Sequence, residues 1–186
     1  KQLSTVEVLA RVDVLCLDKT GTITTGDITF AAAHPAQGRT DDEVRDGLVA
    51  LASSDRDPNA SMAAIAAAVG TDTTWTIDRV EPFDSDRKWS AASFVDRGWF
   101  YLGAPDFLLA PDDPMRELVE RLSAGGKRLL AVATAPDGPD GDRLPARAQA
   151  LAVVELEDEI RPDAAEILAY FAEQDVTLKV ISGDNQ

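Results

Sequence analysis

Two hydrophobic periods alternate along the chain, and their order predicts an α/β protein. Near the start, the run 12–17 is apolar at all but one position and contains β-branched residues, which predicts a buried strand of a parallel sheet. Residues 28–30 predict a second strand, and the aperiodic stretch 31–38 predicts an irregular crossing. Cys16 lies inside the first run, so we expect a buried, unreactive thiol.

Helical spacing begins after Thr40. Thr40 and Glu43 stand at the two ends of a capping box, which predicts a helix start there. Three stripes of apolar residues then recur at helical spacing, and each predicts a buried helix face. The stripes are Val44, Leu48 and Leu51; Met62, Ile65, Ala66 and Val69; and Met115, Leu118, Val119 and Leu122. Gly70 ends the second helix, and Gly125-Gly126 ends the third, which Asp113-Pro114 opens.

Between and after these helices the period changes to that of strands. Strands are expected at 73–80, 90–95, 99–103, 129–134 and 151–156. A tight turn at 96–98 joins two of them, which predicts an antiparallel meander, and 135–147 predicts a loop or hairpin tip. The last stretch returns to α/β order, with a helix opened by 161–163 and a strand at 176–181.

The polar run Asp18-Lys19-Thr20-Gly21-Thr22 directly follows the first strand. Ligands bind outside the carboxyl ends of strands in open α/β sheets, so Asp18 is expected to face a substrate. The run also offers a cation, two hydroxyl groups, and a glycine that lets backbone N–H groups converge on an anion. It therefore predicts phosphoryl transfer to or from Asp18.

The strand at 176–181 ends in a similar way, in Ser182-Gly183-Asp184. In a parallel sheet this end lies beside Asp18, because ligand-binding ends collect at one edge. We therefore expect residues 1–30 and 157–186 to form one domain, with the antiparallel block 31–156 inserted into it.

These motifs resemble those of the P-type cation-transporting ATPases, a branch of the haloacid-dehalogenase-like superfamily. Asp18 to Thr22 resembles the phosphorylation motif, in which the Asp becomes an aspartyl-phosphate. Ile181-Ser182-Gly183-Asp184-Asn185 is similar to the TGDN loop, and Asp158 to Pro162 resembles the DPPR hinge and keeps its Asp and Arg161. The resemblance implies a partial, Rossmannoid phosphorylation domain lacking its C-terminal strands, with an inserted α+β nucleotide-binding domain.

The same resemblance implies roles at the phosphorylation site. Asp18 would be the nucleophile and, with the Thr20 carbonyl, a ligand of Mg²⁺. The other catalytic residues would be Lys19, Thr20 and Asp184. Ser182, Gly183 and Asp184 would hold the phosphoryl oxygens of ATP.

Within the insert, Phe83 to Lys88 looks like the Phe-x-x-Asp-Arg-Lys stretch of the calcium-pump-like branch. The resemblance implies that Phe83 stacks on adenine while Arg87 and Lys88 face the phosphates, and such chemistry fits a nucleotide. Gly103 belongs to a Leu-Gly-Ala-Pro run that resembles the family's Lys-Gly-Ala-Pro. Arg128 resembles a strand-opening Arg that contacts the nucleotide.

Several positions depart from the family pattern. Leu102 replaces a Lys, so one cation near the nucleotide is missing. Residues 57–62 stand in place of the Pro-Thr-Glu stretch, which leaves no carboxylate there to accept from the adenine amino group; Asn59 or Ser61 could substitute. We expect weaker ATP binding. His34-Pro35 superficially resembles a motif of heavy-metal pumps, and we interpret His34 as a loop residue.

Composition limits the partners. With 186 residues, a net charge of -15 and a pI near 4.3, the chain is not suited to nucleic acid or an anionic membrane surface. One cysteine indicates a reducing, cytosolic compartment, and no stretch approaches the roughly 18 apolar residues that span a bilayer. The resemblance implies a place at the cytoplasmic face of the cell membrane, attached to transmembrane and actuator domains. Absent transmembrane segments would bind the transported cation, for which calcium is the natural expectation.

Three functions remain open at this level. The first is the ATP-binding and phosphorylation part of a P-type ATPase, inactive as a fragment. The second is an ATP-binding module that is inert by itself. The third is a soluble haloacid-dehalogenase-type phosphatase with a large cap, which would want a carboxylate as general acid where this chain has Thr20.

Overall fold

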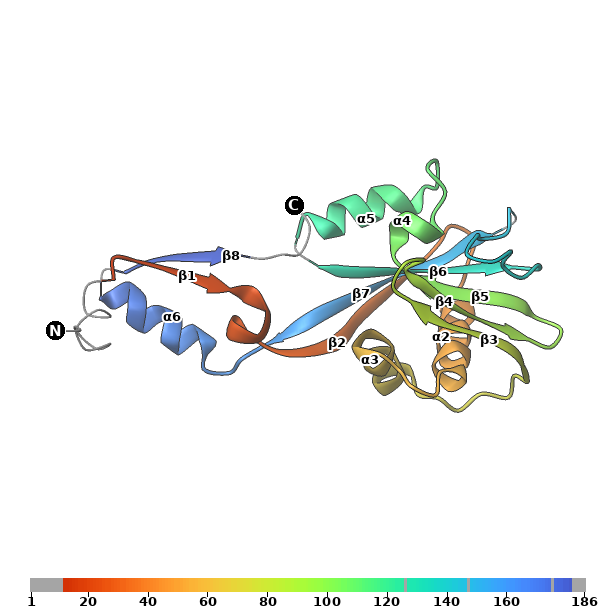
Figure 1. The fold of residues 1–186 in the computed structure, drawn as a ribbon, viewed down its shortest axis with the longest axis horizontal. Coiled ribbons are helices and arrows are strands. Elements are labelled where there is room, and N and C mark those ends of the chain that lie inside the picture. Colours follow the sequence, from red (N-terminus) through yellow and green to blue (C-terminus); the bar gives the residue numbers. More distant parts are fainter. Residues whose placement is uncertain (1–11, 126, 147, 175, 182–186) are drawn as a thin grey trace. The chain divides into compact units, whose positions relative to one another are not determined.

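The computed structural model describes residues 12–125, 127–146, 148–174 and 176–181. The chain divides into two compact units (Figure 1). One comprises the residues up to Asp27 and those from Asp158 onward, and the other comprises Ile28–Glu157. The strands β2 (Thr24–Pro35) and β7 (Gln149–Ile160) both cross the boundary in sequence. The expected mixed α/β architecture, with a sheet flanked by helices, is confirmed.

The first unit is built on a parallel pair of strands. β1 (Val14–Asp18) pairs with β8 (Thr177–Ile181), with Val14 opposite Thr177 and Asp18 opposite Ile181. The π-helix η1 (Lys19–Ile23) follows β1, and α6 (Ala164–Glu173) precedes β8. The parallel pairing agrees with the sequence-based expectation.

This pair is more exposed than its composition predicts. Val14 is 47 % exposed, Ile181 is 60 % exposed and Cys16 is an exposed free thiol. The expectation of a buried strand with a buried cysteine is therefore wrong for the described structure. Among the residues that the structure describes, β1 pairs with β8 alone, and a sheet of two strands leaves more of an apolar run open to solvent than a larger sheet covered on both faces does.

The second unit is a six-stranded sheet in the order β2-β7-β6-β5-β4-β3. Its pairs from β3 to β7 are antiparallel. The remaining elements are α2 (Asp41–Ser54), α3 (Ala60–Val69), β3 (Ile77–Asp84), β4 (Trp89–Phe94), β5 (Gly98–Gly103), α4 (Pro105–Leu108), α5 (Met115–Ser123) and β6 (Arg128–Ala135). The three predicted helices and the antiparallel order of the predicted meander are confirmed, but its first strand runs over 77–84 and not over the predicted 73–80. The helix α4 is an additional short helix.

Each face of this sheet carries its own core, with α2 and α3 on one face and α4 and α5 on the other (Figure 1). Alternate residues of one strand serve opposite cores: Phe100 and Leu102 pack with α2 and α3, whereas Trp99 and Tyr101 pack on the other side. This is the period-two pattern of a sheet covered on both faces. The nucleotide-site residues predicted from the sequence must therefore be assigned to one face or the other.

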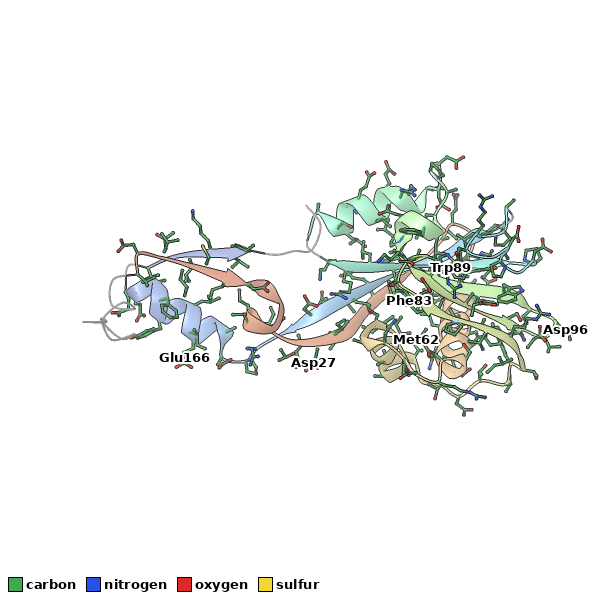
Figure 2. The ribbon with its side chains drawn as sticks, viewed as in Figure 1. Asp27, Met62, Phe83, Trp89, Asp96 and Glu166 are labelled. Atoms are coloured by element: carbon green, nitrogen blue, oxygen red, sulfur yellow. The ribbon has the colours of Figure 1, made fainter. Side chains whose placement is uncertain are left out.

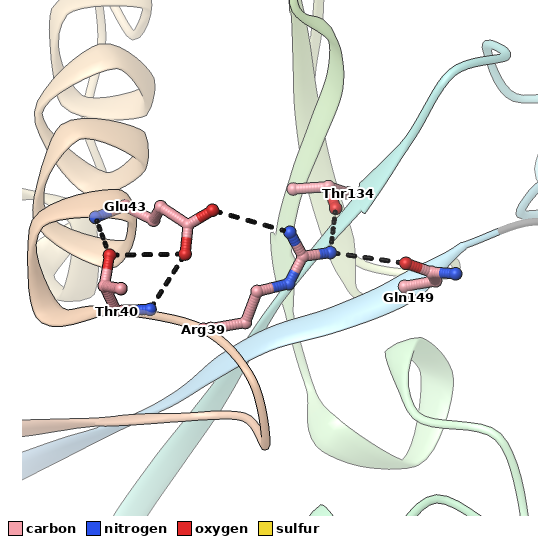
Figure 3. Close-up of polar contacts among 5 residues, drawn as sticks. All are labelled: Arg39, Thr40, Glu43, Thr134 and Gln149. Carbon is pink, nitrogen blue, oxygen red and sulfur yellow. Dashed lines mark hydrogen bonds and ion pairs between the residues drawn. The ribbon is translucent and has the colours of Figure 1, made fainter.

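Figure 3 shows the predicted capping box at the start of α2. The Glu43 N–H donates to Thr40 Oγ1 over 3.2 Å, and the Thr40 N–H donates to Glu43 Oε2 over 2.8 Å. The backbone hydrogen bond from Thr40 lowers the pKa of the Glu43 carboxyl. Arg39 donates to Gln149 Oε1 over 3.3 Å, so the helix start is also tied to β7.

Residues 31–35 belong to β2, so the predicted irregular crossing is wrong there and His34 is a strand residue. Ile28, Phe30 and Ala33 pack against the core beneath α2 and α3. The alternation was hidden because the run Ala31–Ala33 has no contrast between its two faces. His34 Nε2 lies 3.1 Å from Glu155 Oε2 on β7, and Glu155 is buried.

Candidate functional site

Asp18 ends β1, and a local hydrogen bond helps to hold the turn after it. Gly21 has φ of 76°, a left-handed conformation that glycine adopts at no steric cost. Its N–H donates to Thr24 Oγ1 over 3.2 Å. The side chains of Lys19 and Thr20 lie outside what the structure describes, as do residues Ser182, Gly183 and Asp184, which follow the partner strand β8.

Arg161, which directly follows β7, contacts the same turn. Its guanidinium donates to the carbonyl of Thr24 through Nε and to that of Gly21 through Nη2, both over 3.2 Å. Its backbone N–H donates to the Ile23 carbonyl over 3.0 Å. Arg161 therefore connects the segment before α6 to the turn that carries Asp18, a contact that the sequence pattern alone did not predict.

The insert contains a cavity of about 220 Å³, here called the small cavity. Four of the predicted nucleotide-binding residues line it together, although they come from separate parts of the chain: Phe83, Lys88, Gly103 and Arg128. Leu102, Leu130 and Met62 supply apolar walls. Figure 2 labels Phe83 and Met62, which come from β3 and α3; Phe83 remains 48 % exposed. An apolar pocket with a few convergent polar groups is the usual form of a small-molecule site.

Backbone contacts between two turns set the wall formed by Lys88 and Gly103. Lys88 has φ of 59°, and its carbonyl accepts from the Ala104 N–H over 3.0 Å. Gly103 pairs with Trp89 in the sheet, and a Cβ at Gly103 would lie 2.4 Å from the Lys88 carbonyl oxygen. Glycine is required at this position because the two backbones approach too closely for any side chain.

Arg87 is not among the residues that line the small cavity. Its guanidinium lies 4.4 Å from the centroid of the Trp89 ring, and its Nε donates to the Trp89 carbonyl over 3.3 Å. It also donates to the Pro82 carbonyl and forms an ion pair with Glu81 at 3.9 Å. These contacts brace the turn between β3 and β4, with Asp84 accepting from the Asp86 N–H over 2.7 Å.

Residues at the connection from α2 to α3 complete the small cavity. Asn59 and Ser61, the substitutes considered from the sequence, both line it. Asp55, the residue that ends α2, lines it as well, and motif comparison missed it because it precedes the compared stretch. A carboxylate is therefore present at this wall, although the resemblance left none in that stretch to accept from the adenine amino group.

A larger cavity of about 880 Å³ lies against β3 and shares Phe83, Asp55 and Asn59 with the small cavity. Its charged lining residues are Arg56, Arg79, Asp55, Asp57, Asp78 and Glu81. Carboxylates outnumber guanidinium groups in this set, so the large cavity is a poor place for a polyphosphate.

An ionic cluster joins β2, β7 and the start of β6. Glu155 accepts from His34 through Oε2, and its Oε1 lies 3.1 Å from Lys127 Nζ. Lys127 also contacts Glu157. The hydrogen bonds from His34 and Lys127 lower the pKa of the Glu155 carboxyl. In the described ranges no group of three or more His, Cys, Asp or Glu residues is arranged to hold a metal ion.

Comparison with known proteins decides the family. Residues 12–186 match the haloacid dehalogenase-like hydrolases. The chain belongs to this family. The match covers both units, and β1 with Asp18 at its end falls within it.

Within the haloacid dehalogenase-like family, the relatives that match most of the chain are P-type ATPases, as the motifs predicted. A calcium-transporting ATPase, CtpE, of Mycolicibacterium smegmatis is 45 % identical over 99 % of this chain and 23 % of its own length. The probable cation-transporting ATPase exp7 of Streptococcus pneumoniae is 40 % identical over 100 % of this chain and 24 % of its own length. This chain thus spans about a quarter of the length of these relatives.

Solved structures support the fold. A zinc-transporting PIB-type ATPase in its E2.Pi state superposes with a TM-score of 0.67 at 24 % identity, over 97 % of this chain and 27 % of that one. The catalytic domain of the CPx-ATPase CopB-B gives a TM-score of 0.62 at 14 % identity, over 100 % of this chain and 60 % of that one. In the part of the haloacid dehalogenase-like chain that the structure describes, no helix is both long enough and apolar enough to span a bilayer.

Proposed function

We propose that this chain is the ATP-binding and phosphorylation part of an ATP-driven cation transporter, with Ile28–Glu157 as the nucleotide-binding domain. The observation that carries the proposal is the similarity to cation-transporting ATPases along almost the whole chain. The relatives named for calcium favour calcium as the transported ion. Such a protein would hold this chain at the cytoplasmic face of the membrane, joined to its transmembrane and actuator domains.

ATP binding is assigned to the small cavity. The Phe83 ring would stack on the base, a contact typically worth about 1–3 kcal/mol, and Leu102 would line the pocket as an apolar wall. Lys88 and Arg128 would attract the phosphates. Leu102 is 5 % exposed and carries no charge, so it cannot attract the phosphates as the family's Lys would. We therefore expect a Kd for ATP on the order of millimolar, which is a binding free energy of about -4 kcal/mol.

Phosphoryl transfer is assigned to Asp18. A carboxylate oxygen of Asp18 would attack the γ-phosphorus in line, the bond from that phosphorus to the bridging β-γ oxygen would break, and ADP would leave with the electron pair. Lys19 and Thr20 would neutralise and bind the transferred group, together with Ser182 and Asp184. Arg161 would act as a positioning residue, because it holds the carbonyls of the turn that follows Asp18.

The donor set at Asp18 fits Mg²⁺. This ion is usually bound through one or two carboxylates together with substrate phosphates and water, and Asp18 with the Thr20 carbonyl supplies hard oxygen ligands of that kind. When bound, Mg²⁺ neutralises charge on the phosphates.

The test uses the full-length protein and γ-labelled ATP in the presence of Ca²⁺. We expect an acid-stable, hydroxylamine-labile label that Asp18→Asn abolishes. Asp27→Asn is the matched control, since Asp27 is an exposed carboxylate of the same unit. The 186-residue chain alone should not turn over ATP. Absence of label on the full-length protein with any transported cation present would refute the assignment.

A further inference from the structure

We infer that the open edge of β3 is an interface between two copies of this chain, which pair antiparallel about Val80. β3 is the last strand in the order of the six-stranded sheet (Figure 1). Among the described residues it pairs with β4 alone. The outer edge of such a strand presents backbone N–H and carbonyl groups to which a strand of another chain can pair.

The backbone of Val80 is directed at this open edge. The Arg79 N–H donates to Ser93 Oγ on β4 over 3.1 Å, so the backbone of Arg79 faces the sheet. Successive residues of a strand direct their N–H and carbonyl groups to opposite edges, so those of Val80 face outward. Two copies in antiparallel register about Val80 would therefore exchange two backbone hydrogen bonds between their Val80 residues.

An apolar row on β3 fits this register. Ile77, Val80 and Phe83 are 41 %, 42 % and 48 % exposed, and all three line the large cavity. Ile77 pairs with Phe94, and Val80 pairs with Ala92, both in the core beneath α2 and α3. Irregular pairing on either side of Val80 brings the row to one face in spite of its spacing of three. Ile77 of each copy would then lie opposite Phe83 of the other, a favourable aromatic and β-branched pair.

The charged residues of β3 are complementary to themselves in the same register. Arg79 and Glu81 flank Val80, and Glu81 pairs with Ala91, which belongs to the core on the other face. Pairing about Val80 places Arg79 of each copy opposite Glu81 of the other, so two ion pairs form. An axis midway between Arg79 and Val80 would instead place Asp78 opposite Glu81, which are like charges. The charges therefore select the register about Val80.

This contact should join two copies and no more. A two-fold axis at Val80 uses the same edge of both chains, so the contact is closed. The ladder is also short, because Pro82 has no N–H to donate to a neighbouring strand. A contact of this size is typical of weak, transient association, so we expect a Kd for the dimer on the order of 0.1 mM.

The experiment measures self-association of the 186-residue chain by sedimentation equilibrium. Arg79→Glu and Glu81→Arg each place like charges opposite one another, and each should weaken the dimer about tenfold or more. An equimolar mixture of the two variants restores both ion pairs between unlike chains and should associate as the parent chain does. Because the parent carries a net charge of -15, both variants stay strongly negative, and general attraction between them does not account for such a rescue.

Arg45→Glu is the control for the change in net charge, since Arg45 lies on the exposed side of α2. Its dimer should have the Kd of the parent. A second readout, on the parent and Arg79→Glu alone, does not require Glu81→Arg to fold. The Val80 amide hydrogen should exchange more slowly at high than at low concentration of the parent, and this difference should vanish in Arg79→Glu.

Three results would overturn the inference. The first is a parent chain that stays monomeric at millimolar concentration. The second is a mixture of Arg79→Glu and Glu81→Arg that stays monomeric although both variants keep the folded NMR spectrum of the parent. The third is a loss of association in Arg45→Glu as large as that in Arg79→Glu, or a Val80 exchange rate that does not depend on concentration.

Discussion

Phe83 is a large apolar residue whose side chain is unusually open to solvent. A Phe that is 48 % exposed contributes little to a core, yet this ring lies on the walls of both cavities. Aromatic rings left open at a cavity are common features of ligand sites.

We predict that Phe83→Ala weakens ATP binding about 5- to 150-fold, because base stacking contributes about 1–3 kcal/mol. The midpoint of urea unfolding should change little. Phe107→Ala is the matched control, since Phe107 is 49 % exposed and lines neither cavity. NMR titration with ATP measures the affinities. Unfolding of the Phe83 variant with unchanged residual affinity would make Phe83 a core residue instead.

Glu155 should make stability depend on pH. Hydrogen bonds from His34 and Lys127 lower the pKa of its carboxyl below the ordinary value of 4.5, with Glu157 as the other charged group that Lys127 contacts. A carboxyl with a lowered pKa binds its proton less readily in the folded state. Its contribution is therefore complete above pH 4.5 and is lost as the pH falls through the lowered pKa.

We expect Glu155→Gln to lower the free energy of unfolding at pH 7 by about 1.5–3 kcal/mol, the range for hydrogen bonds to charged groups. The difference from the parent chain should shrink as the pH falls below 4.5. Urea titrations at several pH values measure both effects. Glu120→Gln, an exposed carboxylate on α5, serves as the control. A pH-independent loss would mean that Glu155 acts through packing alone.

At the scale of elements, the turn after β1 depends on a residue far away in sequence. Arg161 donates to the carbonyls of Gly21 and Thr24 and so restrains the π-helix η1. Single π-helical turns occur frequently at functional sites.

We predict that Arg161→Ala speeds amide hydrogen exchange in residues 19–24 by about tenfold, because two charge-assisted hydrogen bonds are lost. In the full-length protein the same change should slow phosphorylation of Asp18 and leave the affinity for ATP unchanged. Arg45→Ala, on the exposed side of α2, is the control. Equal exchange in both variants would contradict a positioning role.

At the scale of the whole molecule, the two units contain very different numbers of buried apolar side chains. The two hydrophobic core clusters lie entirely within Ile28–Glu157. In the described part of the other unit, Ala164 is the only buried apolar residue. Since the hydrophobic effect scales with the apolar area removed from water, most of the stability should reside in the insert.

We therefore predict that the segment 28–157 folds by itself, with a midpoint of thermal unfolding within a few degrees of that of the 186-residue chain, and keeps the same ATP affinity. Calorimetry and NMR titration provide the measurements. The complementary test is Leu48→Ala in the segment, a change that typically costs 2–5 kcal/mol, on the order of a third of a domain's stability. A segment that stays unfolded would show that the insert depends on the rest of the chain.

The sequence by itself determined the features that are local. Helices α2, α3 and α5 and the meander from β3 to β5 follow from periodicity, because one buried face imposes its spacing on a continuous stretch. The capping box was predictable for the same reason, since its partners are close in sequence. Motifs such as Asp18 to Thr22 also lie in one continuous run.

Only the tertiary structure decided which distant residues meet and which are covered. The walls of the small cavity come from the α2–α3 connection, β3, the ends of β4 and β5, and β6, so no single stretch could place Asp55 beside Phe83. The strand at 31–35 and the exposure of Cys16 were mispredicted because both depend on neighbours contributed by other segments. Burial depends on how the elements pack against one another. A continuous run of residues supplies only one of the two surfaces that meet in each contact, so its sequence does not show whether it is covered.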